Sequence, residues 1–292
     1  MIKYFNESSS GEDSMSFSEL FNLVFNEKRR IFLDKVARQT RRPRHELLLS
    51  DYRAAEAKVK IGDTLVAQLR KTLDMFGLTR SKMQVSFHEA FLSSCSQDLY
   101  KMDKDTDFVA VHARQGWENF KQSTLCLTPR RMGKTTAIAM FVSAYLFCVP
   151  ETTIAIFSTG RRASLKLLQQ VRSMLLKLPD AEQRVGNIKN KEDLTVLGNN
   201  KHDTRRVSSF PGNATALRGV GGSLVILEEA AFISSAVFYE ICVPLLELGN
   251  TSLLAISTPL DDTNFFSELF DLKDQHGEPF FNTIRILSLI HI

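Results

Sequence analysis

Cysteine is scarce in this sequence, and its placement argues against two common kinds of small-domain scaffold. Only four cysteines occur among 292 residues, and none stands in a C-x-x-C pair or at the spacing of cysteine and histidine ligands. A disulfide framework or a zinc site is normally marked by such spacing. We therefore expect four reduced, mostly buried thiols in an intracellular protein: Cys95, Cys126, Cys148 and Cys242.

A leader, a long apolar run and a strong charge excess are also missing. The N-terminus MIKYFNESSSGEDSMSF lacks a charged region followed by an apolar run, so it does not resemble a secretory signal. The longest apolar stretch, at residues 137–149, contains Ser143 and is too short to span a bilayer. The net charge of +4 is compatible with a polyanionic partner without requiring one. These absences predict a soluble protein that does not act in a membrane.

The pattern of apolar residues changes once along the chain. Residues 1–16 are polar and serine-rich and are expected to be disordered. Residues 17–105 carry apolar side chains at three- and four-residue spacing, which predicts a helical N-terminal region. Over residues 106–285, short β-rich runs alternate with helical ones, which is typical of a parallel sheet flanked by helices. The fold class predicted is therefore α/β, with residues 286–292 leading into a linker or a further domain.

The segment LTPRRMGKTTA, residues 127–137, lies between a predicted strand, STLCLT, and a predicted helix, KTTAIAMFVSAYLF. Gly133, Lys134 and Thr135 match the end of the phosphate-loop pattern G-x-x-x-x-G-K-[ST], whereas Thr128 replaces its first glycine. Backbone N–H groups of such a loop and of the helix N-terminus bind phosphate oxygens. Lys134 would reach the β- and γ-phosphates, and the Thr135 hydroxyl would bind Mg²⁺. The alternative is a basic surface turn. The predicted nucleotide-binding residues are Thr128, Pro129, Arg130, Arg131, Met132, Gly133, Lys134, Thr135 and Thr136.

Two adjacent carboxylates end a second predicted strand. The segment SLVILEEAAFI, residues 223–233, is an apolar run that closes with Glu228 and Glu229. A buried strand next to the phosphate-loop strand would deliver these acids to the metal and to the attacking water. We predict that Glu228 is a metal ligand and that the catalytic Glu229 orients the water. Adjacent buried carboxylates repel each other and lose hydration, which disfavours a purely structural role. The alternative is an exposed pair at a helix N-terminus.

A third predicted strand, SLLAISTP, ends with Ser257 and Thr258. Hydroxyl groups at that place would hydrogen-bond the γ-phosphate or the attacking water. We therefore predict that both residues take part in catalysis by reporting hydrolysis to the rest of the protein.

Taken in order, the segments PRRMGKTT, ATALRGVGGSLVILEEAAFI and LLAISTPLDDTNFFSELFD resemble the ATPase domain of the large terminase subunit, the DNA-packaging motor of tailed bacteriophages and herpesviruses. The resemblance covers residues 108–285. The phosphate loop of that family commonly lacks its first glycine and carries an inner arginine, matched here by Arg130, which would act catalytically within its own subunit. Its A-[LV]-R-G element is matched at residues 216–219 and its S-T-P…N-x-F coupling motif at residues 257–266.

The resemblance implies a P-loop NTPase of the RecA/ASCE type that uses ATP and Mg²⁺ to move double-stranded DNA into a procapsid. It implies a homo-oligomeric ring during packaging, contacts with a portal and a small terminase subunit, and a place inside the infected cell, in the bacterial cytoplasm or in the nucleus. Two other readings remain open at this stage. One is a helicase-like P-loop ATPase, and the other is a nucleotide-binding scaffold that does not hydrolyse ATP.

Two features depart from the pattern of the family. Glu228 stands where the family has a metal-binding aspartate, and its extra methylene group would misplace the carboxylate for Mg²⁺, which tolerates poor geometry badly. The resemblance therefore implies weakened turnover, which Glu228→Asp would keep or increase. The family also continues into an RNase H-like nuclease domain. This chain ends with IRILSLIHI, which is expected to be the linker or first strand of that domain in a truncated chain or incomplete reading frame, so no nuclease activity is expected.

Two basic groups have no assigned role. Residues 28–44 contain eight Lys or Arg and one Asp, which is compatible with a DNA contact, an acidic partner or a solvated helix face. Arg161 and Arg162 follow the predicted strand TTIAIFST and open the next helix. In a ring they would act on the nucleotide of the neighbouring subunit, or they are a solvated pair at a helix start.

Overall fold

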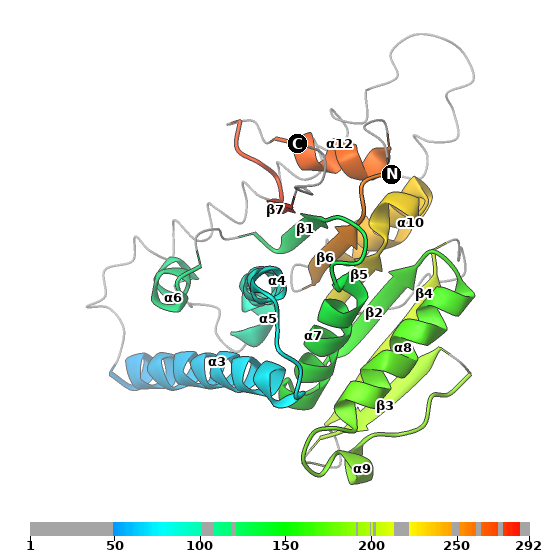
Figure 1. Cartoon of the computed structure of the whole chain (residues 1–292). Helices are drawn as coiled ribbons and strands as arrows, with labels where there is room; N and C mark the ends of the chain where they lie inside the picture. Colours follow the sequence, from blue (N-terminus) through cyan, green and yellow to red (C-terminus); the bar gives the residue numbers. More distant parts are fainter. Residues whose placement is uncertain are drawn as a thin grey trace.

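The computed structural model describes residues 49–100, 108–117, 121–190, 192–198, 200, 203–212, 222–246, 251–260, 264–273 and 277–286 (Figure 1). The predicted disordered segment 1–16, the basic segment 28–44, the A-L-R-G element at 216–219 and residues 287–292 lie outside this description. The boundaries that we place at residues 105 and 285 stay predictions.

The described residues of the N-terminal region lie mostly in helices. It contains α3 (Leu49–Met75), α4 (Lys82–Ser94) and α5 (Ser96–Leu99), and α6 (Phe108–Gln115) follows. Helix α4 begins at a capping box, in which the Ser81 hydroxyl accepts a hydrogen bond from Gln84 N and the Gln84 side chain accepts one from Ser81 N. This arrangement satisfies two N–H groups that a helix start leaves free and thereby sets where α4 begins.

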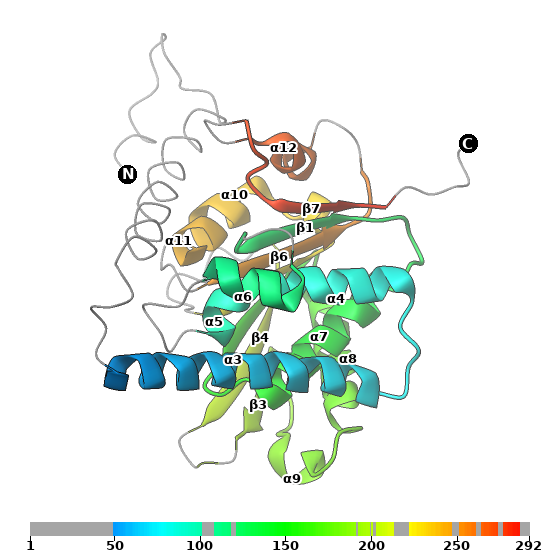
Figure 2. The same ribbon diagram turned by 90° about the vertical axis from the view of Figure 1, so that its left-hand side faces the viewer.

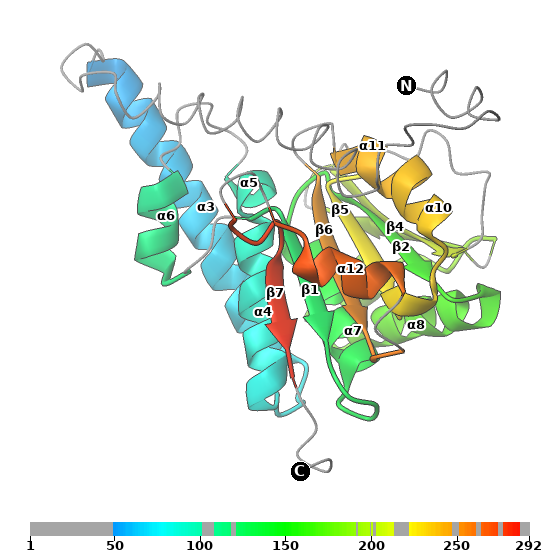
Figure 3. The same cartoon turned by 90° about the horizontal axis from the view of Figure 1, so that it is seen from above.

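The strands form one seven-stranded sheet in the order β3-β4-β2-β5-β6-β1-β7 (Figure 1), and Figure 3 shows β7, β1, β6 and β5 side by side from above. Every neighbouring pair is parallel except β3 and β4, which are antiparallel. The α/β prediction is confirmed, with an antiparallel strand at one edge. The strands are β1 (Ser123–Leu127), β2 (Thr153–Ser158), β3 (Asp193–Leu197), β4 (Thr204–Pro211), β5 (Leu224–Glu228), β6 (Ser252–Ser257) and β7 (Asn282–Arg285).

The order of the strands corrects one expectation. We expect the strand that ends in Glu228 to lie next to the phosphate-loop strand, but β6 lies between β1 and β5. All six residues of β6 are buried, so this strand suits a central place in the sheet. The carboxyl ends still meet at one edge, because Leu127 is level with Ser257 and Ile256 is level with Glu228.

Helices cover both faces of the sheet (Figures 1 and 2). Along β2, Ile154 and Ile156 face one apolar cluster, whereas Ala155 and Phe157 face the other. The first cluster contains side chains of α3 to α6, α7 (Lys134–Cys148), α8 (Arg161–Leu175) and α9 (Ala181–Arg184). The second contains side chains of the 3₁₀ turn η2 (Ala230–Phe232), α10 (Ser235–Val237), the π-helical turn η3 (Phe238–Cys242), α11 (Val243–Leu246) and α12 (Phe265–Asp271).

The N-terminal helices share their core with the seven-stranded sheet. Helix α4 packs against α7 and over β1, β6 and β7, and α3 packs against α7. All four cysteines are free thiols, and only Cys148 is partly exposed. Within the described ranges, we find no helix with both the length and the apolar character needed to cross a bilayer.

Candidate nucleotide and magnesium site

The predicted phosphate loop connects β1 to α7. Gly133 precedes the first residue of α7 and has a φ of 76°, a left-handed conformation that favours glycine. Thr128, at the position of the missing first glycine, is buried, and its N–H donates a 3.0 Å hydrogen bond to Ser257 O. Thr128 therefore continues the pairing of β1 with β6, where a side chain is tolerated. Unlike Thr128, Arg131 within the loop adopts the left-handed conformation, with a φ of 65°.

The two predicted metal-binding residues contact each other. Thr135 lies in the first turn of α7, and its hydroxyl donates a 2.7 Å hydrogen bond to Glu228 Oε1 at the end of β5. The other carboxylate oxygen, Glu228 Oε2, accepts a 2.9 Å hydrogen bond from the hydroxyl of Ser158 at the end of β2. The fold thus brings the ends of three separate elements to one carboxylate.

Glu228 is 6% exposed, which rules out the alternative of a pair of glutamates that are both solvated. Burial is the largest influence on this carboxyl group and raises its pKa. The hydrogen bonds from Thr135 and Ser158 act in the opposite direction, the charge of Glu229 adds to the increase, and Lys134 offsets part of it. The net pKa is raised, so a cation close to this carboxylate would be favourable.

The donor set fits Mg²⁺. A threonine hydroxyl and a carboxylate are the hard oxygen ligands that Mg²⁺ prefers, and this ion commonly takes its remaining ligands from substrate phosphates and water. Across the described part of the chain, no group of three or more His, Cys, Asp or Glu side chains is arranged to hold a metal.

The predicted catalytic glutamate lies between Lys134 and Thr258. Glu229 Oε1 is 3.5 Å from Lys134 Nζ, and Glu229 Oε2 accepts hydrogen bonds from Thr258 N at 3.2 Å and from Thr258 Oγ1 at 3.0 Å. Glu229 has a φ of 52°, a left-handed conformation that is unfavourable for a residue with a side chain. The chain therefore turns sharply at Glu229, directly after β5. The side chain of this residue contacts Lys134 at the end of the phosphate loop and Thr258, which follows β6.

Ser257 and Thr258 differ in what their hydroxyl groups contact. The Ser257 hydroxyl accepts a 3.1 Å hydrogen bond from Ala231 N and donates a 3.0 Å hydrogen bond to Thr258 O. Ser257 therefore holds the turn that follows Glu229, whereas Thr258 contacts the Glu229 carboxylate itself.

The structure also describes the remaining loop residues and the arginines that the sequence singles out. Arg130, Arg131 and Met132 are exposed, and no hydrogen bond or ion pair holds the two arginines among the residues that the structure describes. Pro129 O is 3.5 Å from Lys134 Nζ. Thr136 accepts a 3.2 Å hydrogen bond from Gln170 of α8. Arg161 is 68% exposed and lies 3.7 Å from Glu192, and Arg162 is exposed beside it.

Sequence reasoning missed Ser158 and two residues of α4. Ser158 stands near the end of the predicted strand TTIAIFST, as Ser257 does in SLLAISTP. The reasoning that selected the hydroxyl of Ser257 at a strand end would also have selected Ser158. Met83 and Gln84 contact the phosphate loop from a helix more than forty residues earlier in the chain. No local pattern in the sequence marks them.

Comparison with known proteins gives a matching family and several similar solved structures. The family described as "Terminase large subunit, T4likevirus-type, N-terminal" matches residues 125–279. Among solved structures, the Thermus Phage P74-26 Large Terminase ATPase domain is 18% identical, with 74% of this chain and 84% of that chain covered and a TM-score of 0.54. A mutant form of the same domain has a TM-score of 0.53, with 18% identity and 75% and 85% coverage.

The HK97 bacteriophage large terminase is 14% identical and has a TM-score of 0.54; the match covers 74% of this chain and 41% of that one. At these identities the structural likeness shows a shared fold. The chain spans less than half of the length of the HK97 protein.

Proposed function

Because this chain belongs to the family of large terminase subunits, whose pattern matches more than half of its residues, we propose that it binds ATP with Mg²⁺ and hydrolyses it to drive double-stranded DNA into a procapsid. The observation that carries this proposal is the 2.7 Å hydrogen bond between Thr135 and Glu228. It joins the start of the phosphate-loop helix to the acidic strand end at the place where a nucleotide-bound Mg²⁺ would lie.

Each neighbouring group then has a role in phosphoryl transfer. The phosphate loop and the N-terminus of α7 bind the phosphates, and Lys134 exchanges its contact with Glu229 for the β- and γ-phosphates. A bound Mg²⁺, held by Thr135 and Glu228, would neutralise charge on the phosphate oxygens. Glu229, freed from Lys134, orients the attacking water. Arg130, in the same loop, supplies positive charge to the transition state.

The movement of DNA is the part of the proposal that rests on family membership. It includes a ring of subunits, double-stranded DNA as the substrate that moves, and contacts with a portal and a small terminase subunit inside the infected cell.

The decisive experiment measures phosphate release by the purified protein with and without double-stranded DNA. Wild type is compared with Lys134→Ala and with Lys166→Ala, which removes an exposed lysine of α8 and serves as the control. We expect DNA-stimulated release from wild type and from Lys166→Ala, and neither release nor ATP binding by Lys134→Ala. ATP binding by wild type without phosphate release would support the scaffold instead. Duplex unwinding coupled to hydrolysis would support the helicase.

A further inference from the structure

The first turn of α4 contacts the phosphate loop at both of its ends. The Thr128 hydroxyl, at the start of the loop, donates a hydrogen bond to Met83 Sδ at 3.4 Å. At the end of the loop, Gln84 Nε2 donates a 3.3 Å hydrogen bond to Gly133 O. Gly133 is so close to this side chain that a Cβ atom on it would lie 2.8 Å from Gln84 Nε2. Two consecutive residues of α4 thus span the loop that would hold the phosphates.

One turn later, α4 contacts α7 again. His88 Nε2 is 3.0 Å from Ala137 O, and the His88 ring stacks on Phe141 with 6.2 Å between centroids. Gln84 and His88 are four residues apart, as are the Gly133 and Ala137 carbonyls that they contact. The two helices therefore meet turn against turn, since residues four apart share a helix face. The contact between Gln84 and Gly133 is therefore one of two successive contacts between α4 and the start of α7.

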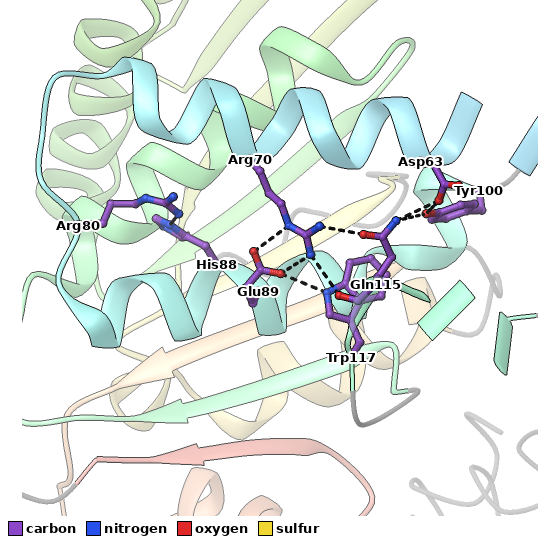
Figure 4. A network of polar contacts seen from close by, with 8 residues as sticks. All are labelled: Asp63, Arg70, Arg80, His88, Glu89, Tyr100, Gln115 and Trp117. Carbon is purple, nitrogen blue, oxygen red and sulfur yellow. Dashed lines mark hydrogen bonds and ion pairs between the residues drawn. The ribbon is translucent and has the colours of Figure 1, made fainter. Parts of the chain in front are cut away.

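Helix α4 is itself anchored (Figure 4). Glu89 accepts hydrogen bonds of 3.0 and 2.6 Å from Arg70 of α3, and a third of 3.3 Å from Trp117 Nε1. Arg70 also donates a 2.8 Å hydrogen bond to the side chain of Gln115 in α6. Two parallel bonds between a guanidinium and a carboxylate fix orientation as well as distance. A side chain on such a helix holds its partner in a defined place.

We propose that Gln84 is a positioning residue for nucleotide binding, which it supports by holding the Gly133 carbonyl and so fixing the conformation of the phosphate loop; this rests on the ATP-binding function proposed above. In a planar trans peptide the C=O and the following N–H point in opposite directions. Holding Gly133 O therefore orients the N–H of Lys134. That N–H is among those of the helix start that α7 leaves free for phosphate.

The Gly133 carbonyl accepts two hydrogen bonds, one from Ala137 N at 2.9 Å within the helix and one from Gln84. A carbonyl oxygen has two lone pairs, so both bonds can form together. The bond within α7 moves with α7, whereas the bond from Gln84 ties the loop to a different helix. Of these two bonds, the one from Gln84 connects the Gly133 carbonyl to another element of the fold.

Gln84 also has a separable structural role, which makes the proposal testable. Its Oε1 accepts the 3.0 Å capping-box bond from Ser81 N, while its Nε2 makes the contact with Gly133. Glutamate at this position of a capping box is at least as good an acceptor as glutamine, but it cannot donate. Gln84→Glu therefore keeps the cap and removes the contact with the loop. Ser81→Ala does the reverse, because it removes the Ser81 hydroxyl that caps Gln84 N and leaves the Gln84 amide in place.

The experiment measures the Kd of a slowly hydrolysed ATP analogue, the KM and kcat for ATP, and the thermal unfolding midpoint. We expect Gln84→Glu to weaken affinity and raise KM by about three- to tenfold, the effect of one lost hydrogen bond, with the midpoint unchanged. We expect Ser81→Ala to lower the midpoint by about 2–8 °C and to leave affinity unchanged at 25 °C. Gln84→Met, which adds no charge near the phosphates, should weaken affinity like Gln84→Glu.

Two results would overturn the proposal while ATP binding by wild type still stood. One is unchanged nucleotide affinity in Gln84→Glu, which would mean that Gln84 only caps α4. The other is weakened affinity in Gln84→Glu but not in Gln84→Met, which would mean that the added charge repels the nucleotide. A wild-type protein that binds no ATP would instead overturn the proposed function together with the role of Gln84.

Discussion

The Ser158 hydroxyl at the end of β2 donates a 2.9 Å hydrogen bond to Glu228 Oε2, while the Thr135 hydroxyl donates one of 2.7 Å to Glu228 Oε1. Both oxygens of this buried carboxylate are therefore held, by hydroxyl groups from two other elements. The longer side chain of Glu228, which departs from the family pattern, reaches both hydroxyls at once. This geometry changes what we expect of variants at the site.

Glu228→Asp should lower turnover, contrary to the expectation from resemblance alone. Shortening the side chain by one methylene group withdraws the carboxylate, so that it cannot keep both hydrogen bonds. The loss of one bond to a charged group corresponds to about a tenfold lower kcat. Steady-state phosphate release measures this effect. Turnover at or above the wild-type rate would show that the family's aspartate suits this site better than its glutamate.

Ser158→Ala should lower kcat by about three- to tenfold, because it releases one oxygen of Glu228 and leaves the Thr135 contact intact. The matched control is Ser209→Ala, which removes another buried serine from the adjacent strand β4, where the hydroxyl donates to Ser164 O. The control should lose stability without losing turnover. Equal effects of the two variants on kcat would contradict a specific role for Ser158.

Glu229→Gln should trap bound ATP. Glutamine can still accept hydrogen bonds from Thr258 through its oxygen, but it cannot take a proton from water, and the loss of a general base costs about 10²-fold or more in rate. Lys134 loses its charged partner and becomes free for phosphate, so ATP affinity should be equal to or higher than that of wild type. Equilibrium binding and single-turnover hydrolysis measure the two effects. The control is Glu240→Gln, which changes a glutamate at an exposed position. Normal hydrolysis by Glu229→Gln would show that Glu229 has no catalytic role.

Arg130→Ala should lose hydrolysis by about 10³-fold, and mixing it with a Lys134→Ala partner should not restore activity. Arg130 lies in the phosphate loop of its own subunit, so a neighbour cannot replace it. Arg161 and Arg162, exposed at the start of α8, are the candidates to act on a neighbour's nucleotide. A subunit that lacks them but keeps its own loop should regain activity in a mixed ring. Restoration of Arg130→Ala by the partner would overturn its assignment to its own subunit.

His88 should make the protein less stable in mild acid. Burial lowers the pKa of His88 from 6.5 to about 4; the hydrogen bond to Ala137 O raises it, Arg80 lowers it further, and Glu89 and Asp74 raise it. The unfolded chain therefore binds the proton first as the pH falls. The contribution of neutral His88 to the free energy of unfolding is complete above pH 6.5 and is lost as the pH falls from 6.5 to 4. At pH 5 the free energy of unfolding should be lower by about 2 kcal/mol.

The variant His88→Gln tests this directly. Its amide can still donate to Ala137 O but does not titrate, so the difference in unfolding free energy between wild type and variant should shrink as the pH falls from 7 to 5. Denaturant unfolding at several pH values measures that difference. A difference that stays constant with pH would show that His88 does not titrate in this range.

The chemistry of the site was predicted from local sequence. Gly133, Lys134 and Thr135 stand between an apolar strand and an apolar helix, and Glu228 with Glu229 end a second apolar strand. The structure places these residues at the start of α7 and at the end of β5, and each placement depends on a few adjacent residues. Apolar runs of five or six residues predict buried strands, and the carboxyl ends of parallel strands meet at one edge of a sheet. The meeting of Thr135 with Glu228 follows from that rule.

What only the tertiary structure decided is the order of the strands and the contacts that come from outside the motifs. Local sequence does not indicate which buried strands lie next to each other in the sheet. The place of β6 between β1 and β5 could therefore not be predicted. The contact of Gln84 with Gly133 joins residues 49 positions apart, and it exists only because apolar packing sets α4 against α7. Such contacts depend on the whole core, because a side chain reaches a distant loop only where the packing of both helices places it.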